Sequence, residues 1–194
     1  MPRISLNTAT ALTGISKRTL WRRIADGLLR TMDPEKRGER AQLDLDEVLP
    51  MACIPLASDD IALVVAADAG EAEAQCDLAL LFLKAGRPTG ALYWLELAAA
   101  QSYPEAMYWL GRCHVSGGGV PRDENIGISW LARAASHGHV IAREQMQALQ
   151  GRNGQAVAPL ASGGGGLDGL LEAIEKRVVA DALRETANPP AASR

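Results

Sequence analysis

The sequence predicts a mostly α-helical chain that consists of a small winged helix-turn-helix, a short α-solenoid of antiparallel helix pairs and an isolated amphipathic C-terminal helix. Three observations predict this. Two helix-like segments meet at a glycine near the start, an alanine and tryptophan pattern recurs in the middle, and an apolar stripe at helical spacing follows a glycine-rich segment. The expected parts are residues 1–50, 57–149 and 167–188, with a flexible linker at 150–166 and a disordered end at 189–194.

The composition is that of a globular protein with an uneven charge distribution. The 194 residues are 47% hydrophobic and 22% charged, with a net charge of -3. Residues 1–50 hold nine Lys and Arg against seven Asp and Glu, whereas the rest holds eleven against sixteen. The basic front is therefore suited to a polyanion, and the acidic remainder is suited to protein partners.

Cysteine and apolar patterns indicate a cytoplasmic protein. Cys53, Cys76 and Cys113 are odd in number and fit neither a disulfide framework nor a zinc knuckle. The N-terminus has no apolar leader, and the longest apolar run, 61–67, is too short to cross a bilayer. We expect neither export nor a membrane association.

The front of the chain has the order of a helix-turn-helix. A short helix over Ile4–Leu12 is expected to break at Gly14. Ser16 is placed as the N-cap of a second helix, which runs from Lys17 to about Asp26. In a helix-turn-helix, the second helix enters the major groove of double-stranded DNA.

The second helix concentrates cations on one face. Leu20 and Ile24 are four residues apart and are expected to face inward, with Leu28 completing a small core. Lys17 and Arg18 lie in the first turn, where the helix dipole repels cations. Local helix stability therefore does not explain them.

A β-wing and a closing helix are expected to follow. Pro34 and Gly38 are turn residues that bracket a basic tip. Either Asp44 or Asp46 is expected to start a short helix that runs through Leu49.

The segments A-L-T-G-I-S-K-R-T-L-W-R-R-I-A-D-G-L-L and R-G-E-R-A-Q-L-D-L-D-E-V-L resemble the winged helix-turn-helix of MerR-type regulators and excisionases. Trp21 departs from the tyrosine-rich positions of that family. The resemblance implies that the second helix reads the major groove and that the wing touches the backbone. The alternative is a small helical domain with a solvated basic face. Together, the resemblance and the charge give these DNA-binding candidates: Ser16, Lys17, Arg18, Thr19, Arg22, Arg23, Lys36, Arg37 and Arg40.

The middle of the chain is an internal repeat. The segment from Ala91 matches the segment from Gly127, a spacing of 36, which aligns Trp94 with Trp130. Small alanines where helices approach and a tryptophan between pairs are typical of stacked helix pairs. The pattern A-M-Y-W-L-G-R-C-H-V-S-G-G-G-V-P-R-D-E-N-I-G-I-S-W-L-A-R-A-A resembles the Sel-like repeat, a relative of the tetratricopeptide repeat. This resemblance implies a scaffold or adaptor that binds partner proteins, without catalysis.

One helix of the array carries a candidate binding anchor. Trp109 is expected to face solvent, flanked by Tyr108 and Arg112, and these three residues are the partner-binding candidates. The alternative is that Trp109 covers a neighbouring helix. His137 and His139 have the wrong spacing for a metal site on one helical face, and no catalytic arrangement is visible. We expect no enzyme activity, no cofactor and no metal.

The tail carries an amphipathic helix with an i,i+4 pair, Glu172 and Lys176. Because a lone helix cannot bury its apolar stripe, it must dock on the array, pair with its copy in a homodimer, or join a partner. The tail resembles the opening helix of the Fis-type DNA-binding domain, which dimerises, but the recognition helix of that domain is missing. The docking or dimerisation candidates are Leu167, Leu170, Leu171, Ile174, Val178 and Leu183.

The sequence favours a bacterial transcriptional regulator or co-regulator that binds DNA through its front and a partner protein through its repeats. The alternative is an adaptor that assembles a bacterial multiprotein complex without binding DNA. A third hypothesis is an enzyme-associated subunit.

Overall fold

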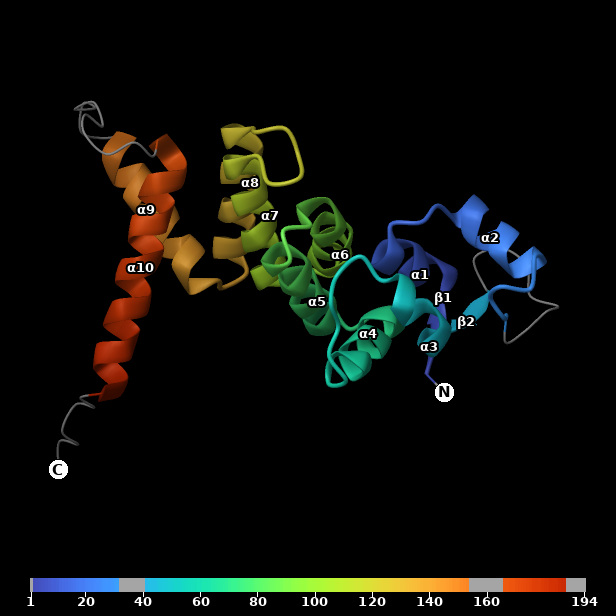
Figure 1. The fold of residues 1–194 in the computed structure, drawn as a ribbon. Coiled ribbons are helices and arrows are strands. Elements are labelled where there is room, and N and C mark those ends of the chain that lie inside the picture. The colour runs from blue at the N-terminus through green and yellow to red at the C-terminus, as the bar shows by residue number, and fades with distance from the viewer. Residues whose placement is uncertain (1, 32–40, 154–165, 188–194) are drawn as a thin grey trace. The chain divides into compact units, whose positions relative to one another are not determined.

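The computed structural model describes residues 2–31, 41–153 and 166–187 (Figure 1). The chain divides into two compact units, residues 1–101 and 102–194, and each is described by itself. Helices dominate both units, which confirms the prediction of a mostly α-helical fold.

The first unit begins with a two-stranded sheet and two short helices. Strand β1, Arg3–Ser5, pairs antiparallel with β2, Gln42–Asp44, and Ile4 lies opposite Leu43. Helix α1 is Leu6–Thr13, capped by the Ser5 hydroxyl, which accepts from the backbone N–H of Thr8. The predicted helix over 4–12 is therefore wrong at its start, because Ile4 is recruited into a strand by a partner far along the chain.

Helix α2, Lys17–Ala25, confirms the predicted second helix. The Ser16 hydroxyl accepts from the Thr19 backbone N–H at 3.2 Å, as the predicted N-cap requires. Leu20 is fully buried. Leu28 does not complete the core, since its side chain is 70% exposed and Leu29 is buried instead. The reason is the turn that ends α2: the N–H groups of Leu28 and Leu29 both donate to the carbonyl of Arg23, and this turns the second leucine inward.

The chain then forms the base of a hairpin. Thr31 bridges antiparallel to Leu43, so residues 32–40 join two paired positions. The predicted wing tip, with Lys36, Arg37 and Arg40, lies outside the described residues. Asp44 caps helix α3, Leu45–Val48, by accepting from the Asp46 N–H, and a 3₁₀ helix, η2, follows at Leu49–Met51.

Three longer helices complete the first unit: α4, Asp60–Ala69, α5, Ala72–Lys84, and α6, Pro88–Ala100. Helices α5 and α6 pack closely because Gly90 lies against the ring of Phe82, where a Cβ atom would be only 2.4 Å from the ring. Asp68 of α4 accepts the backbone N–H of Ser5 on both carboxylate oxygens, at 3.0 and 3.1 Å. This contact ties the sheet and α1 to α4.

The second unit consists of α7, Pro104–Ser116, α8, Glu124–Ser136, α9, Val140–Asn153, and α10, Gly166–Ala187. Helices α7 and α8 cross where Gly111 faces Gly127. The aligned tryptophans differ: Trp94 of the first unit is buried, whereas Trp130 is half-buried beneath the guanidinium of Arg133 at 4.2 Å. The array helix α9 extends beyond the predicted end at 149. The rest of the predicted linker, 154–165, and the predicted disordered end lie outside the described residues.

Helix α10 lies against α9 and α7 within the second unit, which is the docking on the array that the sequence left open beside a homodimer and a partner. Figure 1 shows α10 beside α9. Leu171 and Ile174 are buried there, Leu167, Leu170 and Val178 are half-buried, and Leu183 is 65% exposed. Glu172 and Lys176 form the predicted pair at 2.7 Å. Within 2–31, 41–153 and 166–187, every helix is too short or too polar to span a bilayer.

Candidate partner-binding site

The partner-binding candidates of the sequence lie where α7 meets α10. Tyr108 and Arg112 are four residues apart on α7, so their side chains share one face of the helix. Pro104 starts α7, where a missing N–H costs nothing, and Gly117 ends it in the left-handed conformation at φ 79°. Within this helix, the two side chains lie opposite the N-terminal half of α10.

Arg112 holds two carboxylates of α10. Its Nη1 atom lies 2.5 Å from Oε2 of Glu175, and its Nη2 atom lies 3.3 Å from Oδ1 of Asp168. The hydroxyl of Tyr108 donates to the same Glu175 oxygen at 2.9 Å and accepts from Arg112 at 3.2 Å. The side chain of Arg112 is only 17% exposed, whereas Asp168 and Glu175 are 39% and 29% exposed, so one largely buried guanidinium serves two partly exposed acids.

The ionisation of this cluster follows from its burial. Burial alone would lower the pKa of Arg112, but the Tyr108 hydrogen bond and the charges of Glu175 and Asp168 outweigh it and raise that pKa. Burial raises the pKa of Tyr108 to about 12, although Arg112 opposes this. At neutral pH, Arg112 is thus a cation and Tyr108 a neutral hydrogen-bond donor.

Apolar contacts and one backbone contact complete the seat of α10. Leu171 and Ile174 lie between the two acids in sequence, and both are buried. From α9, the fully buried Gln145 donates through Nε2 to the backbone carbonyl of Leu171 at 2.9 Å. We call this surface, formed by Tyr108, Arg112 and Gln145, the Arg112 seat.

A second hydrogen-bonded group joins α7 to α9 beneath the seat. Glu105 accepts from the Trp109 indole N–H at 2.9 Å on one oxygen and from Nε2 of His139 at 2.9 Å on the other. Since Nδ1 of His139 accepts the Ala142 N–H at 3.1 Å, the imidazole proton is on Nε2. The His139 ring stacks on Tyr108 with centroids 4.3 Å apart. The hydrogen bond from His139 lowers the pKa of Glu105, against the effect of burial.

Trp109 is half-buried rather than fully exposed. It contacts Tyr108 edge to face and lines a groove of about 490 Å³ with Arg112 and the second half of α10. Val179, Ala180 and Leu183 supply the apolar wall of that groove. The Glu172 carboxylate also lines it, and its hydrogen bond with Lys176 lowers its pKa.

The sequence groups Tyr108, Trp109 and Arg112, whose binding of a partner stays a prediction, but it does not bring His139 and Gln145 to the same place. The histidine was considered only as a metal ligand. A signal for Gln145 was available, because it follows Ala142 by three residues and so shares a helix face with a small residue at a contact position.

The DNA-binding candidates that the structure describes are arranged along α2. Lys17, Arg18 and Arg22 are exposed. Thr19 is half-buried and bonds the Ser16 hydroxyl at 3.0 Å. Arg23 is half-buried as well and donates to the sulfur of Met51, so its side chain turns toward the 3₁₀ helix η2 rather than toward solvent.

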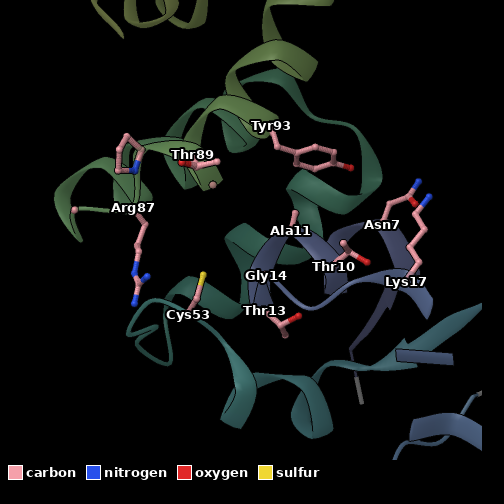
Figure 2. A pocket seen from close by; sticks show the side chains of 13 residues that line it. Asn7, Thr10, Ala11, Thr13, Gly14, Lys17, Cys53, Arg87, Thr89 and Tyr93 are labelled. Atoms are coloured by element: carbon pink, nitrogen blue, oxygen red, sulfur yellow. The ribbon is translucent and has the colours of Figure 1, made fainter. Parts of the chain in front are cut away.

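A pocket of about 680 Å³ lies in the first unit between α1 and the start of α6 (Figure 2). Figure 2 shows Lys17 and Arg87 on opposite sides of it. The hydroxyls of Thr10 and Thr13 are already engaged, because they donate to the carbonyls of Leu6 and Ala9. Two of the polar groups that line this pocket are therefore hydrogen-bonded within α1 itself.

The described part of the chain contains no cluster of three or more His, Cys, Asp or Glu side chains suited to an ion. Cys53, Cys76 and Cys113 form no disulfide. Burial raises the pKa of Cys113 to about 11, so this thiol is not activated.

Comparison with known proteins identifies the repeats. Residues 72–103 and 104–139 match the family model of the Sel1 repeat, so the chain contains two such repeats. A solved structure, the Sel1 repeat protein from Oxalobacter formigenes, is 28% identical over 69% of this chain, with a TM-score of 0.45. The matching region spans 38% of that protein's own length. None of the curated proteins matches this chain.

Proposed function

We propose that this protein is a non-catalytic adaptor that binds a partner protein through its Sel1 repeats. The observation that carries this proposal is the pair of repeats at 72–103 and 104–139, since repeats of this type form protein-interaction surfaces. The polar cluster around Arg112 supports it, because Tyr108 and Arg112 of the second repeat hold an acid of a helix that lies outside the repeats.

The test is cross-linking and mass spectrometry on the full chain, tagged at its native expression level. We expect a partner that co-elutes with the chain and whose cross-links fall on residues 72–153. A chain that elutes alone under gentle lysis, with cross-links only to itself, would contradict the adaptor function.

A second function, DNA binding by residues 1–50, is favoured by a specific arrangement. Helices α1 and α2 are joined by a short turn in which Gly14 has φ 67° and Ser16 caps α2. The cations at the start of α2 are exposed, and the first turn of α2 contains no acidic residue. This is the layout in which a recognition helix presents its N-terminal residues to the major groove.

DNA binding is tested with the full chain and a Lys17, Arg18, Arg22 triple-alanine variant in band-shift assays across a salt series. A DNA-binding helix would lose affinity, and its log-log salt slope would fall by up to about 3, roughly one for each phosphate contact removed. The matched control replaces three exposed cations outside residues 1–50 by alanine and so removes the same charge: Lys84, Arg143 and Arg184. Equal losses of DNA affinity in both variants would mean that only the overall charge matters. The adaptor function without specific DNA binding would then remain.

A further inference from the structure

We infer that the Arg112 seat is where the repeats bind the helix of a partner protein, and that α10 occupies this seat until the partner displaces it. The partner helix carries two carboxylates seven residues apart, with branched apolar residues at the third and sixth positions after the first acid. This inference rests on the proposed adaptor function and adds the chemistry of the partner.

The charge of the seat selects an acidic helix. Arg112 is largely buried, and a buried guanidinium without a carboxylate is strongly destabilising. Its two terminal nitrogens each reach one acid of α10, at positions 168 and 175. Those positions are seven residues, or two turns, apart, so a helix in the same register reaches both nitrogens with acids spaced at seven. The Tyr108 hydroxyl adds a donor for the second acid.

The rest of the recognition does not depend on the identity of α10. Leu171 and Ile174 lie three and six positions after Asp168, and both are buried. Gln145 donates to a main-chain carbonyl, which every helix in this register offers. Any helix with the same four side chains on one face would therefore make the same contacts.

Helix α10 fits the seat incompletely. Its first half supplies all the contacts with Arg112, Tyr108 and Gln145, whereas Val179 and Leu183 in its second half are 46% and 65% exposed. Ala180 faces the groove of about 490 Å³ beside Trp109. A partner with a large apolar side chain at the equivalent position, twelve after the first acid, would fill this groove and bind more tightly than α10 does.

A helix from another protein is a better competitor than α10 from a second copy. Twelve residues, 154–165, join α9 to α10, and a linker of that length gives an effective concentration on the order of 1 mM. An identical helix from a second copy, at micromolar concentration, would lose to the tethered one. For an intrinsic Kd of about 1–10 μM, vacating the seat would improve the apparent affinity for an added helix roughly 100- to 1,000-fold.

The experiment measures fluorescence anisotropy with a labelled peptide of residues 166–187. It compares the full chain with a full-length variant carrying Leu171→Asp and Ile174→Asp, which vacates the seat. We expect binding to the vacated variant at least about a hundredfold tighter than to the wild type. If the double variant does not fold, as judged by circular dichroism, Glu175→Lys vacates the seat by charge instead.

Two further substitutions test the chemistry. Arg112→Ala in the vacated chain is expected to weaken peptide binding at least about tenfold. Its matched control is Arg133→Ala on α8, which is expected to leave binding unchanged. The peptide with Ala180→Leu is expected to bind several-fold more tightly than the native peptide.

Three results would overturn the inference: no peptide binding to either vacated chain, binding that ignores Arg112, or a wild-type dimer at micromolar concentration with exchanged α10 helices. The adaptor function fails separately. If cross-linking captures a partner that the peptide does not displace, the inference about the Arg112 seat is wrong and the adaptor function stands. If the chain has no partner at all, the adaptor function is wrong.

Discussion

Replacing Gly127 by alanine tests how closely α7 and α8 must approach. A Cβ atom at this position would lie 2.5 Å from Cγ2 of Val115 and 2.9 Å from the carbonyl oxygen of Gly111. The valine is buried and the oxygen belongs to a helix backbone, so neither can move away alone. The two helices must separate to admit the methyl group.

The two effects of this substitution have opposite signs. In a helix interior, alanine is more favourable than glycine by about 1 kcal/mol. Forcing a methyl group into a close-packed contact costs about 1–3 kcal/mol. Because two rigid neighbours resist the methyl group here, we expect the upper half of that range and a net loss of about 1–2 kcal/mol in the free energy of unfolding.

Urea unfolding followed by circular dichroism measures the change. The matched control is Gly169→Ala in α10, where nothing lies within 4 Å of the added Cβ and we expect a gain of up to about 1 kcal/mol. A Gly127→Ala protein as stable as the wild type would refute the close-contact argument, and so would a loss of equal size in the control.

Three other predictions follow from the second unit. The pKa of Glu105 is lowered from 4.5, so its contribution to stability is present above that value and is lost as pH falls through the folded-state pKa. In the Glu105→Gln variant, the free energy of unfolding should therefore fall less steeply below about pH 5 than in the wild type. An unchanged pH dependence would contradict this. Asp123→Ala should lower the free energy of unfolding, measured in urea, by about 1 kcal/mol, because this side chain caps α8 by accepting the N–H groups of Asn125 and Ile126. An unchanged free energy would show that solvent replaces the cap. Burial raises the pKa of Cys113 from 9.0 to about 11. This thiol should therefore react with iodoacetamide about a hundredfold more slowly in the native chain than in the unfolded chain, as measured by mass spectrometry. Equal rates would show that the helix around Cys113 opens.

Local signals were sufficient for the helix caps and the repeat. Ser16 is predictable as a cap, and Asp44 as one of two candidates, because a capping side chain acts on an N–H two or three residues away. The repeat register placed helix pairs correctly because alanine and glycine at contact positions leave a direct trace in the sequence. Ile4 and Leu28 were misplaced for the opposite reason. A strand partner 39 residues away decides the first, and the geometry of a turn decides the second.

Of the candidate site, only the residues on α7 were predictable from the sequence. Spacing on a single helix was enough to group Tyr108, Trp109 and Arg112. Their carboxylate partners on α10 were not predictable, because a glycine-rich segment of sequence separates the two helices and carries no information on how they meet. The role of His139 was hidden in the same way, since its partner Glu105 lies 34 residues earlier.

The contact between Asp68 and Ser5 limits how freely this architecture can be recombined. Both oxygens of a carboxylate in α4 accept the N–H of the residue that also caps α1. A gene fusion that joined residues 1–50 to an unrelated domain would leave that N–H without its acceptor, and a natural shuffling event would have to bring its own acid to the same place. The front module and the helix that follows it are therefore inherited best as one block, with a breakpoint after α4 rather than before it.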